Sequence, residues 1–156
     1  MVETRRAVDL DTARRAFARE AVVRVATIGP AGPLVVPLWF VWETPAIYCS
    51  AFGDTMTLDN VRHDPRVALA FDAGREWEEL GGVVLRGTAR ALRPEHPDLR
   101  GPMSRWYEKY RERFGPMGYR SFAETTHRLW FLRIVIDELT WWDHGSGPFA
   151  GGSRGR

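Results

Sequence analysis

Cysteine and histidine are scarce in this chain of 156 residues, which has one cysteine and four histidines. The single cysteine, Cys49, excludes a disulfide within the chain and a metal site made only of cysteines. No histidine lies two or four residues from another, so a histidine metal site is not expected either. Because Cys49 stands within an apolar run, we predict that its thiol is buried in the core.

Long hydrophobic runs are also absent. No apolar stretch approaches the roughly 20 residues that cross a membrane, and the N-terminal segment MVETRRAVDLD lacks the apolar centre of a signal peptide. The net charge is only +2, and the arginines are scattered, which is weak evidence for nucleic-acid binding. We expect a cytoplasmic protein that has neither a membrane nor a nucleic acid as its partner.

Strand-like segments dominate what is present. Apolar runs follow one another through short connections, and tightly connected strands form antiparallel sheets. The expected strands cover residues 22–28, 34–42, 46–51, 67–71, 80–92 and 129–136. Helical patterns are expected at 9–20, 55–63, 97–114 and 119–126. This order favours a mostly β (α+β) fold, a small antiparallel barrel of about six strands with peripheral helices. The chain length fits one domain at 1–144, followed by a disordered glycine-rich tail at 145–156.

Chemistry-bearing patterns are few when the residues are taken alone. A P-loop is not found. Alternation along 80–92 puts Arg86, Thr88 and Arg90 on one strand face, where they could bind an anion or simply cover an exposed surface. Trp141 and Trp142 near a strand end could stack on a planar ligand, but aromatic residues more often lie in a core or an interface.

Short motifs also recur in a fixed order along the chain. They are V-A-T-I at 25–28, V-V-P-L-W-F at 35–40, Y-C-S-A at 48–51, T-M-T-L-D-N at 55–60, N-V-R-H-D-P-R-V-A-L at 60–69, L-R-G-T-A at 85–89 and W-D at 142–143. Their order and spacing resemble the pyridoxamine-5′-phosphate-oxidase-related flavin-binding proteins. More narrowly, the chain is similar to the split-barrel flavin/deazaflavin oxidoreductases of actinobacteria.

This resemblance implies a split β-barrel flavoprotein that is a homodimer with its site at the interface. It implies FMN as the cofactor, with the deazaflavin coenzyme F-420 as the alternative, and hydride transfer to or from a small-molecule substrate. It names no catalytic acid or base. The cofactor-binding residues that it implies are Val35, Val36, Pro37, Trp39, Ser50, Ala51, Thr55, Thr57, Asn60, Arg62, Arg86 and Trp142.

Thr57 departs from the family pattern, because relatives carry there a lysine that contacts the cofactor phosphate. A hydroxyl can hydrogen-bond a phosphate but supplies no charge. Arg62, Arg86 or an arginine from the second subunit could replace the missing charge. The alternative is a non-catalytic flavin or haem binding or carrier protein on the same barrel. A haem site would need a histidine ligand, for which only His63 and His144 are placed.

Overall fold

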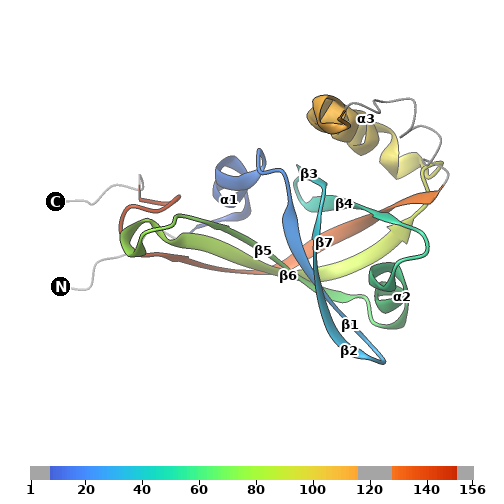
Figure 1. Cartoon of the computed structure of the whole chain (residues 1–156), viewed down its shortest axis with the longest axis horizontal. Helices are drawn as coiled ribbons and strands as arrows, with labels where there is room; N and C mark the ends of the chain where they lie inside the picture. The colour runs from blue at the N-terminus through green and yellow to red at the C-terminus, as the bar shows by residue number, and fades with distance from the viewer. Residues whose placement is uncertain (1–7, 116–127, 151–156) are drawn as a thin grey trace.

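The computed structural model describes residues 8–115 and 128–150. Its centre is a seven-stranded antiparallel sheet in the order β2-β1-β5-β6-β7-β4-β3 (Figure 1). The strands are β1 (Val23–Gly29), β2 (Gly32–Leu38), β3 (Phe40–Glu43), β4 (Ala46–Phe52), β5 (Arg66–Ala73), β6 (Gly81–Leu92) and β7 (Leu129–Asp143). The α-helices are α1 (Leu10–Phe17), α2 (Met56–His63) and α3 (Arg100–Tyr110), and short 3₁₀ helices are η1 (Trp77–Glu79), η2 (Pro97–Leu99) and η3 (Arg111–Arg113).

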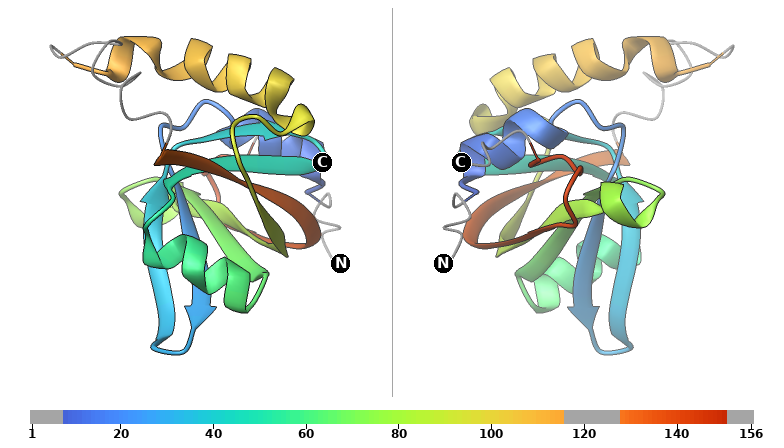
Figure 2. Two further views of the ribbon diagram at one scale, coloured as in Figure 1. Left: turned by 90° about the vertical axis from the view of Figure 1, so that its right-hand side faces the viewer. Right: turned by 90° about the vertical axis from the view of Figure 1, so that its left-hand side faces the viewer.

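The two edge strands of the sheet, β2 and β3, are consecutive in the chain, and only Trp39 separates them. The sheet therefore curls upon itself to bring its edges together, and Figure 2 shows the resulting barrel from its two sides. The curl leaves β2 and β4 joined at the Trp39 corner, where the Ser50 amide donates to the Trp39 carbonyl at 2.9 Å. The expected split barrel is confirmed, with seven strands in place of about six because the run 34–42 breaks at Trp39.

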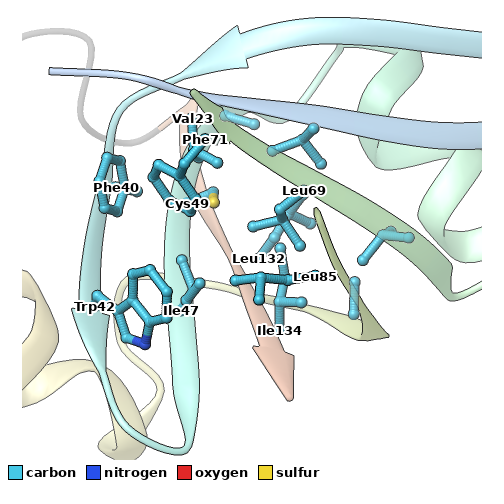
Figure 3. Close-up of a cluster of buried hydrophobic side chains, with 14 of the residues drawn as sticks. Val23, Phe40, Trp42, Ile47, Cys49, Leu69, Phe71, Leu85, Leu132 and Ile134 are labelled. Carbon is cyan, nitrogen blue, oxygen red and sulfur yellow. The ribbon is translucent and has the colours of Figure 1, made fainter. Parts of the chain in front are cut away.

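The interior of the barrel, which we call the barrel core, is apolar (Figure 3). Leu69, Leu85 and Leu132 are fully buried there, and Phe71 stacks on Phe17 and Trp42. Cys49 is also fully buried in the barrel core, as expected, and burial raises the pKa of its thiol.

A second apolar cluster, which we call the α3 cluster, lies between α3 and the outer face of the sheet. Its buried members are Val41, Ala46, Tyr48, Leu92, Leu99, Trp106, Tyr110, Leu129 and Phe131. Strand β4 is buried on both faces, since Ile47 and Cys49 face the barrel core and Tyr48 faces α3. That position explains why β4 is an unbroken apolar run instead of an alternating one.

Helices α1 and α2 are fixed to the barrel by specific side chains. The Asp9 carboxylate caps α1 by accepting from the Thr12 amide at 2.7 Å, and Ala13 and Phe17, one turn apart, enter the barrel core. Asn60 of α2 donates to the Thr27 hydroxyl of β1 at 3.0 Å. No helix in the described ranges, 8–115 and 128–150, has the length and apolar character to cross a membrane.

The boundary predicted for the C-terminal tail is placed too early. The Asp143 carboxylate accepts hydrogen bonds from the amides of Gly145, Gly147 and Phe149. The Phe149 ring then packs edge-on against Phe17 at 5.8 Å. Residues 145–150 are therefore part of the barrel domain, because one carboxylate organises the turn and one aromatic side chain anchors it. Residues 151–156 lie outside the described part of the chain, as does the helix expected at 119–126.

Candidate functional site

A pocket of about 670 Å³ opens between β2, β4, the start of α2 and the end of α3. This volume is in the range of about 300–1,000 Å³ that is usual for small-molecule and cofactor sites. Most of its lining is apolar. The lining residues are Leu34, Val36, Pro37, Leu38, Trp39, Ser50, Ala51, Phe52, Thr55, Met56, Thr57, Trp106, Arg113, Phe114 and Leu129.

The pocket exists because β2 departs from β4 before the Trp39 corner, whereas β3, after the corner, stays paired with β4. Alternation along β2 directs Leu34, Val36 and Leu38 to one face, and all three line the pocket. On the opposite face, Val35 is 62% exposed. One wall of the pocket is thus the inner face of the edge strand β2. An edge strand also tolerates a proline such as Pro37, because its outer edge needs no partner strand.

Aromatic rings form the wall of the pocket toward α3. The Trp39 ring lies parallel to Tyr110, with centroids 4.2 Å apart and 3° between the planes. Trp106 and Phe114 approach the same Trp39 ring at 5.6 and 5.9 Å. A hydrogen bond fixes this wall to β3, because the Tyr110 hydroxyl accepts from the Phe40 amide at 2.9 Å.

Polar groups line the pocket where α2 begins. The Thr55 hydroxyl donates to the Phe52 carbonyl at 2.8 Å, and the Ser50 hydroxyl approaches the Trp39 carbonyl at 3.4 Å. Thr57 is 3% exposed and forms no side-chain hydrogen bond within the described residues, so its hydroxyl can serve a ligand. No hydrogen bond within the same residues uses the amides of Met56 and Thr57, which begin the helix.

Two titratable side chains lie behind the aromatic wall. The Lys109 ammonium donates to the Ala18 and Phe40 carbonyls, both at 3.0 Å, and lies 3.6 Å from the Phe40 ring centroid. Burial, followed by repulsion from Arg113, lowers the pKa of Lys109 to about 8. Burial also raises the pKa of Tyr110 to about 12. Both groups thus belong to the support of the pocket and not to its lining.

Seven of the predicted cofactor-binding residues line this pocket, and five do not. Those brought together are Val36, Pro37, Trp39, Ser50, Ala51, Thr55 and Thr57. Those placed elsewhere are Val35, Asn60, Arg62, Arg86 and Trp142.

Asn60 and Arg62 are engaged in contacts of α2 with the barrel. Asn60 is 4% exposed, and its side chain fits beside Gly29, where a Cβ would lie 1.9 Å from the Asn60 Oδ1. Arg62 pairs with Asp59 at 3.1 Å and lies over the Trp130 ring at 5.0 Å. Neither side chain lines the pocket of this chain, because α2 turns Asn60 toward β1 and Arg62 toward the start of β7.

Val35, Arg86 and Trp142 also point away from the pocket. Arg86 is exposed and pairs with Glu138 across β6 and β7 at 3.0 Å. Trp142 pairs in register with Gly82, where a Cβ would lie 2.6 Å from the Trp142 ring. Within this chain, neither Arg62 nor Arg86 supplies the positive charge that is absent at Thr57.

The residues from α3 and its C-terminal extension were not predicted. Arg113 is the one charged residue among those that the structure describes in the lining, and Trp106 and Phe114 accompany it. A helical pattern at 97–114 indicated that these residues share a helix, but not which strand that helix covers. Among the described residues, no group of three His, Cys, Asp or Glu side chains could hold a metal ion.

Solved structures with diverse ligands share this fold. The FAD-binding protein mll6688 from Mesorhizobium loti has a TM-score of 0.68 at 18% identity, over 87% of this chain and 93% of its own. The haem storage protein HutZ from Vibrio cholerae has a TM-score of 0.66 at 14% identity, over 90% and 98%. An F420 reductase has a TM-score of 0.64 at 14% identity, over 86% and 98%. At such identities the likeness shows the fold alone.

No curated protein matches the chain. The family model described as pyridoxamine 5′-phosphate oxidase, however, matches residues 10–140, which include every element that forms the pocket. This match covers most of the 156 residues. The chain therefore belongs to the pyridoxamine 5′-phosphate oxidase family.

Proposed function

We propose that the pocket between β2, β4, α2 and α3 binds FMN, and that the protein is an oxidoreductase acting on a small molecule. The observation that carries the proposal is the division of the pocket into a polar end at α2 and a long apolar wall. FMN is divided in the same way, because its phosphate is polar and its ring system is planar and largely apolar. FMN supplies the redox chemistry when bound, and the protein supplies its orientation.

The start of α2 suits the phosphate. The amides of Met56 and Thr57 and the Thr57 hydroxyl are donors with no partner among the described residues. Free amides at the N-terminus of a helix favour an anion through their dipoles. The site thus provides neutral hydrogen-bond donors for a phosphate, although it lacks the positively charged lysine found in relatives.

The strand β2 suits the isoalloxazine ring. Leu34, Val36 and Leu38 form an apolar surface that excludes water from one side of a planar ligand. The described lining contains no carboxylate and no imidazole. Proton transfers in the proposed reaction would therefore involve the substrate or solvent instead of a residue of this lining.

A homodimer is part of the proposal. The β1–β2 hairpin exposes apolar side chains on its outer face, where Ile28 is 50% and Val35 is 62% exposed. A second subunit placed against this face would cover them and could bring its own residues to the pocket. Sedimentation of a stable monomer at micromolar concentration would contradict the shared site.

A binding or carrier protein is the second candidate, and the neutral side chain of Thr57 favours it because weaker phosphate binding suits reversible transfer. The haem storage and F420 neighbours show that this fold accommodates other ligands. A visible absorption spectrum of the purified protein distinguishes FMN, the deazaflavin coenzyme and haem.

The decisive experiment is a titration of FMN against the wild type and Thr57→Lys. We expect Thr57→Lys to bind FMN several-fold more tightly, since a charge-assisted bond to phosphate exceeds a neutral one by about 1 kcal/mol. Thr140→Lys is the matched control, because Thr140 is exposed on β7 and does not line the pocket. Equal effects of the two substitutions, or none, would contradict phosphate binding at the start of α2.

A further inference from the structure

We infer that the outer face of the sheet, beside the α3 cluster, carries an anion site that binds a phosphoryl group, either as free phosphate or on a small molecule. The site is a row of three donor side chains, which we call the arginine row: Tyr48 on β4, Arg133 on β7 and Arg90 on β6. None of the three lines the pocket proposed for FMN, so the inference does not depend on the proposed function.

The register of the sheet brings these three side chains together. Tyr48 stands directly opposite Arg133, and Arg133 stands directly opposite Arg90. Residues paired in this way on antiparallel strands have Cβ atoms about 4.5–5.5 Å apart. All three point outward, because the adjacent Cys49 and Ile134 are buried in the barrel core and Arg90 belongs to the exposed face of β6.

The two positive charges of the arginine row are not neutralised by the described residues. Neither Arg90 nor Arg133 forms an ion pair or a hydrogen bond with them. By contrast, Arg86 on the same face of β6 pairs with Glu138 on β7 at 3.0 Å. Like charges directly opposite each other on neighbouring strands destabilise a sheet. An anion between the two guanidiniums would remove this repulsion, so its binding would stabilise the fold.

An acidic side chain lies at the same end of β6, but it is already paired. The Ala89 amide donates to the Pro65 carbonyl at 2.8 Å, which brings Asp64 to this end of the strand. The Asp64 carboxylate accepts from the Arg66 guanidinium at 3.0 and 2.6 Å. These bonds lower the pKa of Asp64 to about 2, so its charge belongs to Arg66 and leaves Arg90 without a counterion.

Tyr48 adds a neutral donor at the packed end of the row. Its ring belongs to the α3 cluster and is 8% exposed, and its hydroxyl forms no hydrogen bond within the described residues. Arg133 is half-buried beside it, and Arg90 is exposed at the other end. The arginine row therefore has one end fixed by packing and one end open to a ligand from solvent.

The arrangement suits a phosphate better than a carboxylate. Each guanidinium presents a planar fork of donors, and one fork alone satisfies the two oxygens of a carboxylate. A phosphoryl group carries three acceptor oxygens and close to two negative charges near neutral pH. It can therefore accept from two guanidiniums and a hydroxyl at once.

Thermal melting in inorganic phosphate tests the inference, with sodium chloride added to hold the ionic strength constant. A ligand that binds only the folded protein raises its melting temperature. The variants are Arg90→Gln and Arg133→Gln, and the matched control is Arg75→Gln, which removes an exposed arginine from the β5–β6 connection that has no ion pair within the described residues. We expect each row variant to bind phosphate about fivefold more weakly, and Arg75→Gln to bind it like the wild type.

Two further probes define the ligand. Acetate should raise the melting temperature less than phosphate does, and equal stabilisation by the two ions would overturn the inference. Glycerol 3-phosphate distinguishes the two sources of the phosphoryl group. A response that depends on Arg90 and Arg133 would assign the site to phosphate monoesters, and a response to inorganic phosphate alone would assign it to the free ion. Equal loss of phosphate binding in Arg75→Gln and the row variants would also overturn the inference.

The titrations are repeated in FMN-saturated protein, because free phosphate could also occupy the start of α2. A phosphate response that persists there and depends on Arg90 and Arg133 would support a separate site. Weaker FMN binding in both row variants would assign these arginines to the cofactor and overturn this inference alone. Absence of FMN binding to the wild type would contradict the proposed function, and the response of the protein alone would still decide the inference.

Discussion

The barrel core and the α3 cluster are packed by different kinds of side chain. Leu69, Leu85 and Leu132 are typical of the barrel core, which fills the space between strands and contains no charged group among the residues that the structure describes. The α3 cluster contains Trp106 and Tyr110 and is bordered by Lys109. The Tyr110 hydroxyl and the Lys109 ammonium both hydrogen-bond to the backbone. The difference indicates that the barrel core sets the architecture, while the α3 cluster positions a wall of the pocket.

The two clusters also differ in how directly they touch the pocket. Leu129 and Trp106 of the α3 cluster line it, whereas Ala51 alone represents the buried barrel core in the lining. A change in the barrel core should therefore alter stability more than binding. A change in the α3 cluster should alter both properties.

The strongest test compares Leu85→Ala with Leu99→Ala, because both side chains are fully buried, one in each cluster. Removing a buried leucine leaves a cavity, and each change should lower the free energy of unfolding by about 2–5 kcal/mol. Urea denaturation measures this loss. Only Leu99→Ala should also weaken FMN binding, by loosening α3. Similar FMN affinities for the two variants would show that α3 does not position the pocket.

A smaller effect is expected at the Tyr110 hydroxyl, which joins α3 to Phe40 at the start of β3 and to Ala21 just before β1. This hydroxyl accepts from the Phe40 amide and lies 2.8 Å from the Ala21 carbonyl. Tyr110→Phe keeps the stack with Trp39 but leaves the buried Phe40 amide without its acceptor, which should cost about 1–3 kcal/mol. A loss below about 0.5 kcal/mol would mean that water satisfies the amide.

The sequence predicted the strands well because their alternation reflects the barrel directly. Arg86, Thr88 and Arg90 are exposed, and Leu85 is buried, as the pattern of 80–92 indicated. The break at Trp39 was missed because the run 34–42 is apolar throughout, and an apolar run does not show where a strand bends. The local pattern thus predicted which residues of a strand are buried and which are exposed, but it did not predict the bend at Trp39.

The site was predicted in part for a related reason. Family motifs placed Ser50, Thr55 and Thr57 together, since these residues are close in sequence and lie beside one pocket. A motif does not show which face of a short helix is buried, and Asn60 was therefore assigned to the cofactor instead of to Thr27. Arg113 was missed because its contact with the pocket joins segments more than seventy residues apart, such as 39 and 113.

The buried position of Lys109 gives a pH-dependent prediction. Its folded-state pKa, about 8, lies below the ordinary lysine value of 10.5 because burial disfavours the charged form. Between these values the unfolded chain binds more protons, so Lys109 makes the folded state more stable as pH rises from about 8 to 10.5. The difference in melting temperature between wild type and Lys109→Met should therefore shift in favour of the wild type over this range. A constant difference would mean that Lys109 is solvated.

The smallest effects are expected at Arg86 and Arg90, which share the exposed face of β6 but have opposite surroundings. Arg86 pairs with Glu138, whereas Arg90 lies opposite Arg133 in the register of β6 and β7. Arg86→Gln should lower stability by no more than about 0.5 kcal/mol. Arg90→Gln should be neutral or slightly stabilising, because like charges opposite each other on neighbouring strands repel.

Thermal melting at low and high salt measures both changes, and salt should reduce the difference between the two variants. Neither residue lines the pocket of its own chain, so FMN affinity should not change if only that chain contacts the cofactor. A salt-sensitive loss of FMN affinity in Arg86→Gln would instead indicate that the second subunit's arginine supplies the charge absent at Thr57. The weakest stability effect in the series therefore provides a sensitive test of whether the site is shared between subunits.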